Sequence, residues 1–213
     1  MTSENQSQQD KDATQQAAEE KSESSQVRDL FILSALWLPM GFFLWFYLSS
    51  VLVAPVMLIC DALFEWVAPE LVRGMVQQGY RIVAHVPVIA GPVGDGADGV
   101  LTNPLIYGYG VPLLFGLVMA TPPLSWKQRI GQILFGYAAM LAVQSWGVFW
   151  EIMKNLSFQL GPGAAVAVED LGFSKTLIAL CYQMGYLILP AVVPIALWIL
   201  FNRRFLERVA RRW

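Results

Sequence analysis

Four long stretches of the chain carry no charged side chain. A helix needs about 20 apolar residues to cross the hydrocarbon core of a bilayer, and each stretch is long enough to supply them. The pattern therefore predicts an all-α polytopic membrane protein with four transmembrane helices. The charge-free stretches are Leu30–Cys60, Gly99–Trp126, Ile130–Trp150 and Thr176–Asn202, and the predicted helices lie at residues 30–55, 104–121, 129–150 and 177–201.

The first stretch is too long to be a span alone. As a helix rising about 1.5 Å per residue, it would reach about 46 Å, against a hydrocarbon core of roughly 30 Å. We expect the surplus to continue as a helix past the outer interface until Pro69 breaks or bends it. Leu71, Val72 and Met75 then form one face of a short amphipathic helix, which we expect to lie along the membrane surface.

The segment between the first and second spans carries a β pattern. Residues 80–88 are rich in β-branched side chains and partly alternate, and a Gly- and Asp-rich turn at 94–99 leads to a short apolar run at 100–103. These features predict a small β-hairpin on the periplasmic side. Asp95 and Asp98 could ligate calcium, but the remaining ligands of a calcium loop are missing, so turn chemistry explains them better.

Basic residues gather on one side of the predicted spans. Of the 14 cationic residues, all but Arg73, Arg81, Lys154 and Lys175 fall in the two tails or in the link between the second and third spans. Positively charged loops stay cytoplasmic, so this distribution places both termini inside. We therefore expect a multi-pass membrane protein with both termini cytoplasmic.

The chain divides into two tails around a membrane domain. The first tail is polar, has no aromatic side chain and is expected to be disordered. The last tail is basic. The predicted parts are a disordered cytoplasmic tail at 1–29, a four-helix membrane domain at 30–201 with periplasmic loops at 64–103 and 151–175, and a basic cytoplasmic tail at 202–213.

The basic tail also has a helical spacing. Phe205, Val209 and Trp213 recur every four residues, with arginines between them. This spacing is typical of a helix that lies on an anionic inner leaflet. An ordinary stop-transfer anchor explains the arginines equally well, and the two interpretations are compatible.

The overall composition agrees with a membrane protein. Of the 213 residues, 56% are hydrophobic and 14% are charged, whereas soluble domains carry about 25% charged residues. A soluble protein this apolar would expose surfaces that aggregate. The formal net charge of -2 gives no reason to expect a nucleic-acid partner, so membrane lipids are the expected surroundings.

Few residues could carry chemistry. Cys60 and Cys181 are the only thiols; they could form a disulfide on the outer side or, more simply, be two buried small apolar side chains. A cysteine nucleophile would need His85 as its base, and nothing in the sequence brings His85 to either thiol. We therefore predict no catalytic residue, no cofactor site and no metal site.

Polar residues within the spans suggest contacts between helices. Amides and hydroxyls in hydrocarbon normally bond to a neighbouring helix, which makes Gln144, Tyr182 and Gln183 candidates for interhelical polar contacts. Pumps and carriers usually place ionisable residues in the middle of the membrane, and the predicted spans hold none there. A small transporter or channel subunit, with its pathway around Gln144, Gln183 and Tyr107, stays the alternative function.

Several pieces of the sequence, taken in order, suggest a family. They are Trp37-Leu38-Pro39, Asn103-Pro104-Leu105-Ile106-Tyr107-Gly108-Tyr109-Gly110, Gln144-Ser145-Trp146-Gly147, Tyr182-Gln183, Pro190, Pro194 and Trp198. With them the chain resembles the exosortase H-associated membrane proteins, small multi-span proteins encoded beside an exosortase in bacteria. The resemblance implies an accessory role in sorting or processing C-terminally tagged exported proteins, and it carries over no catalytic residue. Exosortases use a membrane-embedded Cys with Arg and His, a setting that both thiols of this chain lack.

These observations lead to one functional hypothesis. We expect a non-enzymatic accessory protein of an exosortase-type sorting system, which binds the exosortase or its exported substrate. The two periplasmic loops would present the interaction surface. Its candidate residues are Arg81, His85, Asn103, Tyr107 and Glu151.

Overall fold

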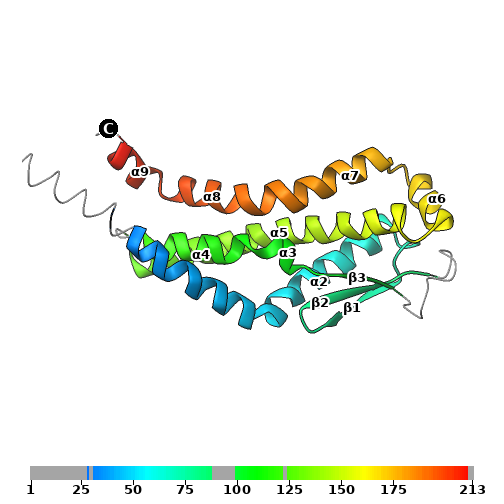
Figure 1. The fold of residues 1–213 in the computed structure, drawn as a ribbon, viewed down its shortest axis with the longest axis horizontal. Helices are drawn as coiled ribbons and strands as arrows, with labels where there is room; N and C mark the ends of the chain where they lie inside the picture. The colour runs from blue at the N-terminus through cyan, green and yellow to red at the C-terminus, as the bar shows by residue number, and fades with distance from the viewer. Residues whose placement is uncertain (1–27, 29–30, 88–98, 122–123, 211–213) are drawn as a thin grey trace, which may run out of the picture.

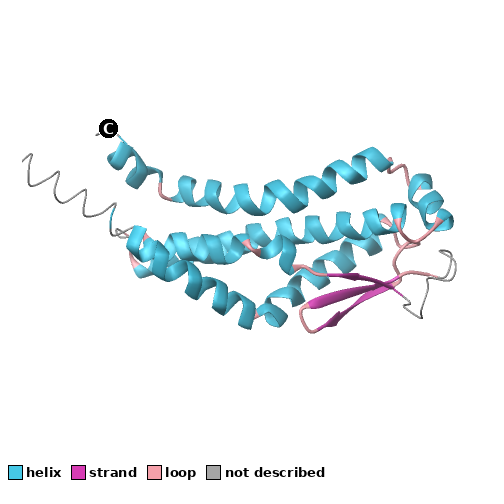
Figure 2. Cartoon of the chain, in the orientation of Figure 1, coloured by secondary structure: helices cyan, strands magenta, loops and turns pink. Residues whose placement is uncertain are grey.

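Helices lie along one long axis of the molecule, and a small sheet packs at one end of them (Figure 1). The computed structural model describes residue 28 and residues 31–87, 99–121 and 124–210. Figure 2 shows the sheet as the only magenta element among cyan helices. The described helices are Phe31–Tyr47, α2 (Ser49–Val67), α3 (Leu105–Gly108), α4 (Gly110–Ala120), α5 (Trp126–Phe158), α6 (Pro162–Asp170), α7 (Lys175–Gln183), α8 (Leu189–Phe201) and α9 (Arg203–Ala210), and a π-helical turn over Met184–Ile188 joins α7 to α8.

Among the residues that the structure describes, three helical segments are long and apolar enough to cross a membrane. They are Ser49–Val67, Trp126–Phe158 and Lys175–Phe201, and two shorter apolar helices cover Phe31–Tyr47 and Leu105–Ala120. The protein is therefore mostly helical with candidate membrane-spanning helices, as the sequence pattern predicts. Length and composition identify three spans, so the count of four stays a prediction.

The first apolar stretch is divided into two helices. The helix over Phe31–Tyr47 ends before Leu48, whose φ and ψ are -87° and 6°, and α2 begins at Ser49. The two helices meet at an angle in Figure 1, from blue to cyan. The first apolar stretch is therefore not one continuous helix, and the span at 30–55 stays a prediction. The break at Leu48 lies directly before Ser49-Ser50, and small polar pairs of this kind are sites where helices kink.

A three-stranded antiparallel sheet follows α2, in the order β1-β2-β3. The predicted pairing of residues 80–88 with 100–103 appears as β2 with β3, from Ile82 opposite Thr102 to His85 opposite Gly99. The side of the membrane on which it lies stays a prediction, and Asp95 and Asp98 lie outside the described residues. The strands are β1 (Gly74–Gln78), β2 (Arg81–His85) and β3 (Gly99–Thr102).

The expected surface helix after Pro69 is wrong, because residues 74–78 form strand β1. Met75 is buried and Val76 is exposed, an alternation that fits a strand with one covered face. Gly79, at a φ of 64°, makes the tight turn into β2. The side-chain nitrogen of Gln77 donates to the carbonyl of Ser50 across 2.6 Å, which ties the strand to α2.

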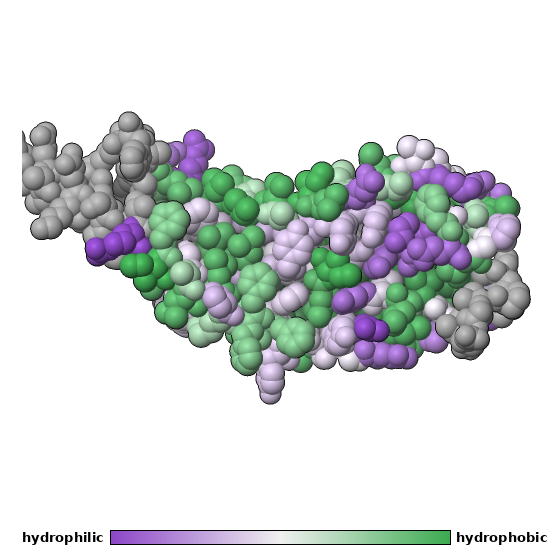
Figure 3. Space-filling model, in the orientation of Figure 1, coloured by the Kyte–Doolittle hydropathy of each residue, from purple (hydrophilic) through white to green (hydrophobic). Residues whose placement is uncertain are grey.

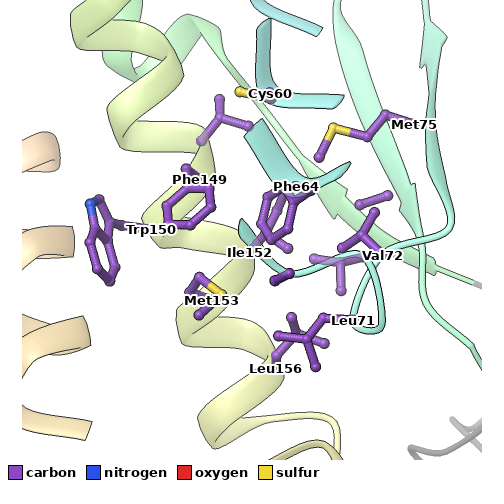
Figure 4. Packing of buried hydrophobic residues seen from close by; sticks show 14 of the residues in the cluster. Cys60, Phe64, Leu71, Val72, Met75, Phe149, Trp150, Ile152, Met153 and Leu156 are labelled. Atoms are coloured by element: carbon purple, nitrogen blue, oxygen red, sulfur yellow. The ribbon is translucent and has the colours of Figure 1, made fainter. Parts of the chain in front are cut away.

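One hydrophobic core joins the sheet to the helices. Figure 4 shows Phe64 of α2 and Phe149 of α5 between the sheet and α5, and their ring centroids are 4.6 Å apart. Leu71, Val72 and Ile82 extend the same buried cluster into the sheet region. The sheet is therefore not an independent domain, and its position is fixed by packing against α2 and α5.

The second predicted loop, at 151–175, is largely helical. Helix α5 continues to Phe158, α6 lies inside the segment, and Lys175 begins α7. The predicted periplasmic segment at 151–175 is therefore built largely of helix, and α5 extends two turns beyond the apolar stretch; the side of the membrane on which the segment lies stays a prediction. An ion pair of 2.9 Å between Lys175 and Glu169 links α6 to α7.

Candidate functional site

One face of α5 brings small and polar residues against α3 and α4. Gly136, Met140, Gln144, Gly147 and Glu151 follow one another at intervals of three and four residues, so they lie on the same face. A Cβ added at Gly136 would lie 2.0 Å from Leu114 of α4, and one at Gly147 would lie 2.3 Å from the Tyr107 ring. Small residues thus allow the close approach of these helices, as is typical of packing in membranes.

Tyr107 enters this interface from α3. The chain turns into α3 after Asn103, whose side-chain oxygen accepts a hydrogen bond of 3.2 Å from the backbone nitrogen of Leu105. The Tyr107 side chain is 0% exposed, and its hydroxyl lies near the carboxylate of Glu151 and the hydroxyl of Tyr182 without a hydrogen bond to either. Three helices, α3, α5 and α7, therefore meet around one tyrosine hydroxyl.

Aromatic rings and one cation complete the junction. Tyr182 of α7 and Tyr186 of the π-helical turn stack with centroids 5.9 Å apart, and Tyr186 meets the edge of Tyr107 at 6.4 Å. The ammonium of Lys154 lies 4.4 Å above the Tyr182 ring, in the range of a cation–π interaction. The name Tyr107–Glu151 cluster is used below for Tyr107, Gln144, Glu151, Lys154, Tyr182 and Tyr186.

The π-helical turn has a local cause in the sequence. Pro190 has no backbone N–H to donate to the preceding turn, and the turn over Met184–Ile188 widens just before it. Such turns often occur at functional sites. Here the turn carries Tyr186 into the cluster.

Several polar atoms of the cluster have no hydrogen-bond partner. These buried atoms without a partner are the Tyr107 hydroxyl, the side-chain nitrogen of Gln144 and one carboxylate oxygen of Glu151. Buried polar groups are normally paired, so each unpaired group needs an explanation. Lys154 is the cation of the cluster and lies near Glu151 and over the Tyr182 ring. The cluster can both donate and accept hydrogen bonds, which suits a small polar group or water.

The structure places the candidate residues named from the sequence in different environments. It places Gln144 and Tyr182 at interhelical contacts in the cluster, but leaves Gln183 exposed. On the sheet, Arg81 and His85 are exposed. Of the other three, Tyr107 is wrong as a surface residue because it is fully buried, Asn103 lies two residues before α3, and Glu151 lies within α5.

Sequence reasoning missed Lys154, Tyr186 and Gly147 as parts of the site. A usable signal was present for two of them. Gly147 and Lys154 lie on the α5 face that also carries Gln144 and Glu151, at helical spacing. Tyr186 could not be found in the same way, because its position depends on the π-helical turn.

Both cysteines are free and buried, so they form no disulfide. This agrees with the simpler of the two expectations. The Cys60 thiol donates to the backbone carbonyl of Ser145 across 3.6 Å. His85 is exposed on β2, so the arrangement does not make it the base of a buried thiol. Among the described residues, no group of His, Cys, Asp or Glu could hold a metal ion.

The exposed surface of the helices defines the class of protein. Large apolar side chains such as Phe43 and Leu187, 74% and 61% exposed, cover the helices, and Figure 3 shows hydrophilic residues gathered at the sheet end. Such a surface belongs to a helical membrane protein. The chain is a member of the family of exosortase H-associated membrane proteins, whose family description matches residues 24–205.

The family match confirms the resemblance of the sequence. It extends over all the described helices except the C-terminal part of α9, and over the whole sheet. No curated protein and no solved structure matches the chain. The family name associates this membrane protein with an exosortase system.

Proposed function

We propose that this protein is a non-enzymatic accessory protein of an exosortase-type sorting system in the bacterial inner membrane. Its periplasmic surface is presented to the protease or to an exported substrate. The observation that carries the proposal is the family match over residues 24–205. The packing of a sheet and α6 onto one end of the helices supports it, because this end offers a folded polar surface.

The distribution of charge supports the proposed orientation. The first turn of α5 carries Lys127 and Arg129, and the C-terminal tail carries five arginines. The start of α5 and the start of α9, with Arg203 and Arg204, lie at the end of the molecule opposite the sheet (Figure 1). Basic segments near membrane spans stay in the cytoplasm, so the proposed arrangement keeps residues 1–29 and 202–213 inside and the sheet with α6 outside.

The proposed interaction surface is the exposed part of the sheet. Arg81 and His85 are exposed on β2, and the Arg81 guanidinium lies 5.4 Å from the centre of the Tyr80 ring. Arginine and tyrosine are the residues that most often dominate binding at protein interfaces. We assign Arg81 and Tyr80 as the centre of the surface.

The Tyr107–Glu151 cluster has a positioning role in this proposal. Strand β3 ends at Thr102 and leads through Asn103 into α3, which carries Tyr107. The cluster therefore connects the sheet to α5 and α7. It sets the position of the proposed surface relative to the helices without itself touching a partner.

Co-purification tests the proposal. The protein is expressed with its exosortase, cross-linked in native membranes and recovered by an affinity tag. We expect the exosortase or its substrate in the eluate, and we expect the Arg81→Glu variant with Tyr80→Ala to recover at least tenfold less. The Arg73→Glu variant on the same end serves as control. Recovery of the protein alone, or equal recovery with the folded double variant, would contradict the proposal.

A small transporter or channel subunit is the second candidate. The unpaired atoms of Tyr107, Gln144 and Glu151 between the helices favour it, because a polar pathway needs such groups. A cysteine placed at Gln144 decides between the two. Reaction with a small water-soluble thiol reagent in membranes would support a pathway, and complete protection would dismiss it.

A further inference from the structure

A cavity of about 420 Å³ lies at the end of the molecule opposite the sheet, between the link from α4 to α5 and the junction of α8 with α9. Its lining combines polar and apolar side chains. The polar ones include Gln128, Arg203 and Arg204, and the apolar ones include Leu124, Leu200 and Phe205.

The junction of α8 with α9 is held in place by buried contacts. The side-chain nitrogen of Asn202, a buried residue, donates to the carbonyl of Trp198 across 2.9 Å and to Gln132 of α5 across 3.3 Å. Phe205 is buried, and its backbone nitrogen donates to the carbonyl of Asn202. The Phe205 side chain thus packs back onto the other helices, and this contact fixes the first turn of α9 at the cavity.

The charge around the cavity favours an anion. Arg203 and Arg204 line the cavity, Lys127 is exposed at the start of α5 beside Gln128, and Glu207 is the acidic residue of α9. Arg203 binds Glu207 at 2.7 Å, but both side chains are substantially exposed and such pairs contribute little. A guanidinium carries five N–H donors, so this contact does not prevent Arg203 from binding a phosphate.

The apolar part of the lining favours an amphiphile over a free anion. Leu200 is 67% exposed and continues the apolar surface of α8 away from the cavity. Trp126, also exposed, lies at the start of α5, and tryptophan is enriched at the level of lipid headgroups. A phosphate beside the arginines would therefore have acyl chains along Leu200.

We propose that this cavity binds the headgroup of an anionic phospholipid, with Arg203 and Arg204 on its phosphate. Basic pockets between helices at the cytoplasmic side of membrane proteins are suited to such headgroups. The proposal is independent of the exosortase role, because it concerns the opposite end of the molecule.

Thermal unfolding of the full-length protein in detergent tests the site. Phosphatidylglycerol, phosphatidylcholine and inorganic phosphate are added separately. We expect phosphatidylglycerol to raise the unfolding midpoint in a saturable way, and the other two to leave it nearly unchanged. An equal rise with phosphatidylcholine, or with inorganic phosphate, would overturn the proposal of an anionic lipid site.

Double variants test whether the two arginines at the cavity cause the response to phosphatidylglycerol. Arg203→Gln with Arg204→Gln should weaken the response to phosphatidylglycerol by roughly 30-fold in apparent affinity, at about 1 kcal/mol for each arginine. Arg203→Lys with Arg204→Lys keeps the charge that orients the chain, and should show an intermediate loss. Arg73→Gln with Lys175→Gln removes the same charge at the other end and should respond as the wild type does. An unchanged response of the Gln pair would refute the site.

Discussion

At the scale of single residues, glycine decides how closely α3 and α4 approach α5. The space that a Cβ would need at Gly147 is filled by the Tyr107 ring, with 2.3 Å between them. At Gly131 of the same helix, nothing lies within 4 Å of an added Cβ. Both glycines lie within α5, so comparing the same substitution at the two positions separates the effect of helix propensity from the effect of packing.

Replacing Gly147 with alanine should therefore destabilise the protein. Tyr107 is fully buried and cannot move away without displacing α3, and overpacking of this kind typically costs about 1–3 kcal/mol. The thermal midpoint of the purified variant in detergent measures the effect. Gly131→Ala is the control: it should leave the midpoint unchanged or raise it, since alanine is favoured over glycine in a helix by roughly 0.5–1 kcal/mol. Equal midpoints for the two variants would contradict the packing described here.

Glu151 and Lys154 are expected to stabilise one another. Lys154 lies near Glu151 and over the Tyr182 ring, 4.4 Å from its centre. Lys154→Met should lower the free energy of unfolding by about 0.5–2 kcal/mol, because the cation–π contact is lost. The double variant with Glu151→Gln should lose less than the sum of the single variants.

A second charge pair provides the comparison for that double-mutant cycle. Lys175 and Glu169 are each 51% exposed, and exposed pairs typically contribute about 0.2–1 kcal/mol. The coupling energy measured for Glu151 with Lys154 should exceed that for Glu169 with Lys175. Additive effects in the first pair would show that the cluster is not an energetic unit.

At the scale of elements, Arg129 joins α4 to α5. Its guanidinium donates to the carbonyl of Thr121 across 2.9 Å and also to the carbonyl of Met119. These carbonyls belong to the C-terminal end of α4, where the helix leaves its own acceptors unpaired. A capping box of Ser125 with Gln128 begins α5 on the same link.

Arg129→Lys should destabilise the protein although it preserves the charge. A lysine ammonium lacks the planar fork of donors of a guanidinium, so it cannot bind several carbonyls at once. The carbonyls left without a donor would cost about 1–3 kcal/mol. The unfolding midpoint should fall in this variant. Lys127→Arg, at an exposed position on the same turn, should leave the unfolding midpoint unchanged. An equal fall of the midpoint in that control would show that the contacts of Arg129 are not the cause.

The helices were predictable from the sequence to the extent that hydrophobicity determines them. Charge-free runs located α4, α5 and α8, and Pro69 lies two residues beyond the end of α2. The formation of strand β1 depends on tertiary contacts. Gln77 binds α2, and Met75 packs in the core; both contacts favour a strand over the helix that local pattern suggested.

The candidate site was predictable only in part, for a related reason. Gln144 and Tyr182 stood out as polar residues in apolar helices, and the structure places both at helix interfaces. The burial of Tyr107 was not visible in the sequence. It depends on Gly147 lying opposite it on another helix, and a pairing of that kind between distant segments is set by the packed fold.

At the scale of the whole molecule, polarity is divided between two ends. The sheet and α6 form one end, and the basic link and α9 form the other, with exposed apolar helix surface between them (Figure 3). In a bilayer we expect the two ends to face opposite compartments. The proposed partner surface and the proposed lipid site therefore lie on different sides of the membrane.

Thiol labelling in intact cells tests this division most directly. Gln78→Cys on β1 and Lys127→Cys at the start of α5 are exposed positions, and the native Cys60 and Cys181 are 0% and 9% exposed and should not react. With a membrane-impermeant maleimide, we expect the cysteine at position 78 to be labelled in cells whose inner membrane is intact. The cysteine at position 127 should be labelled only after that membrane is permeabilised. Labelling of both positions in intact cells, or of position 127 alone, would contradict the account.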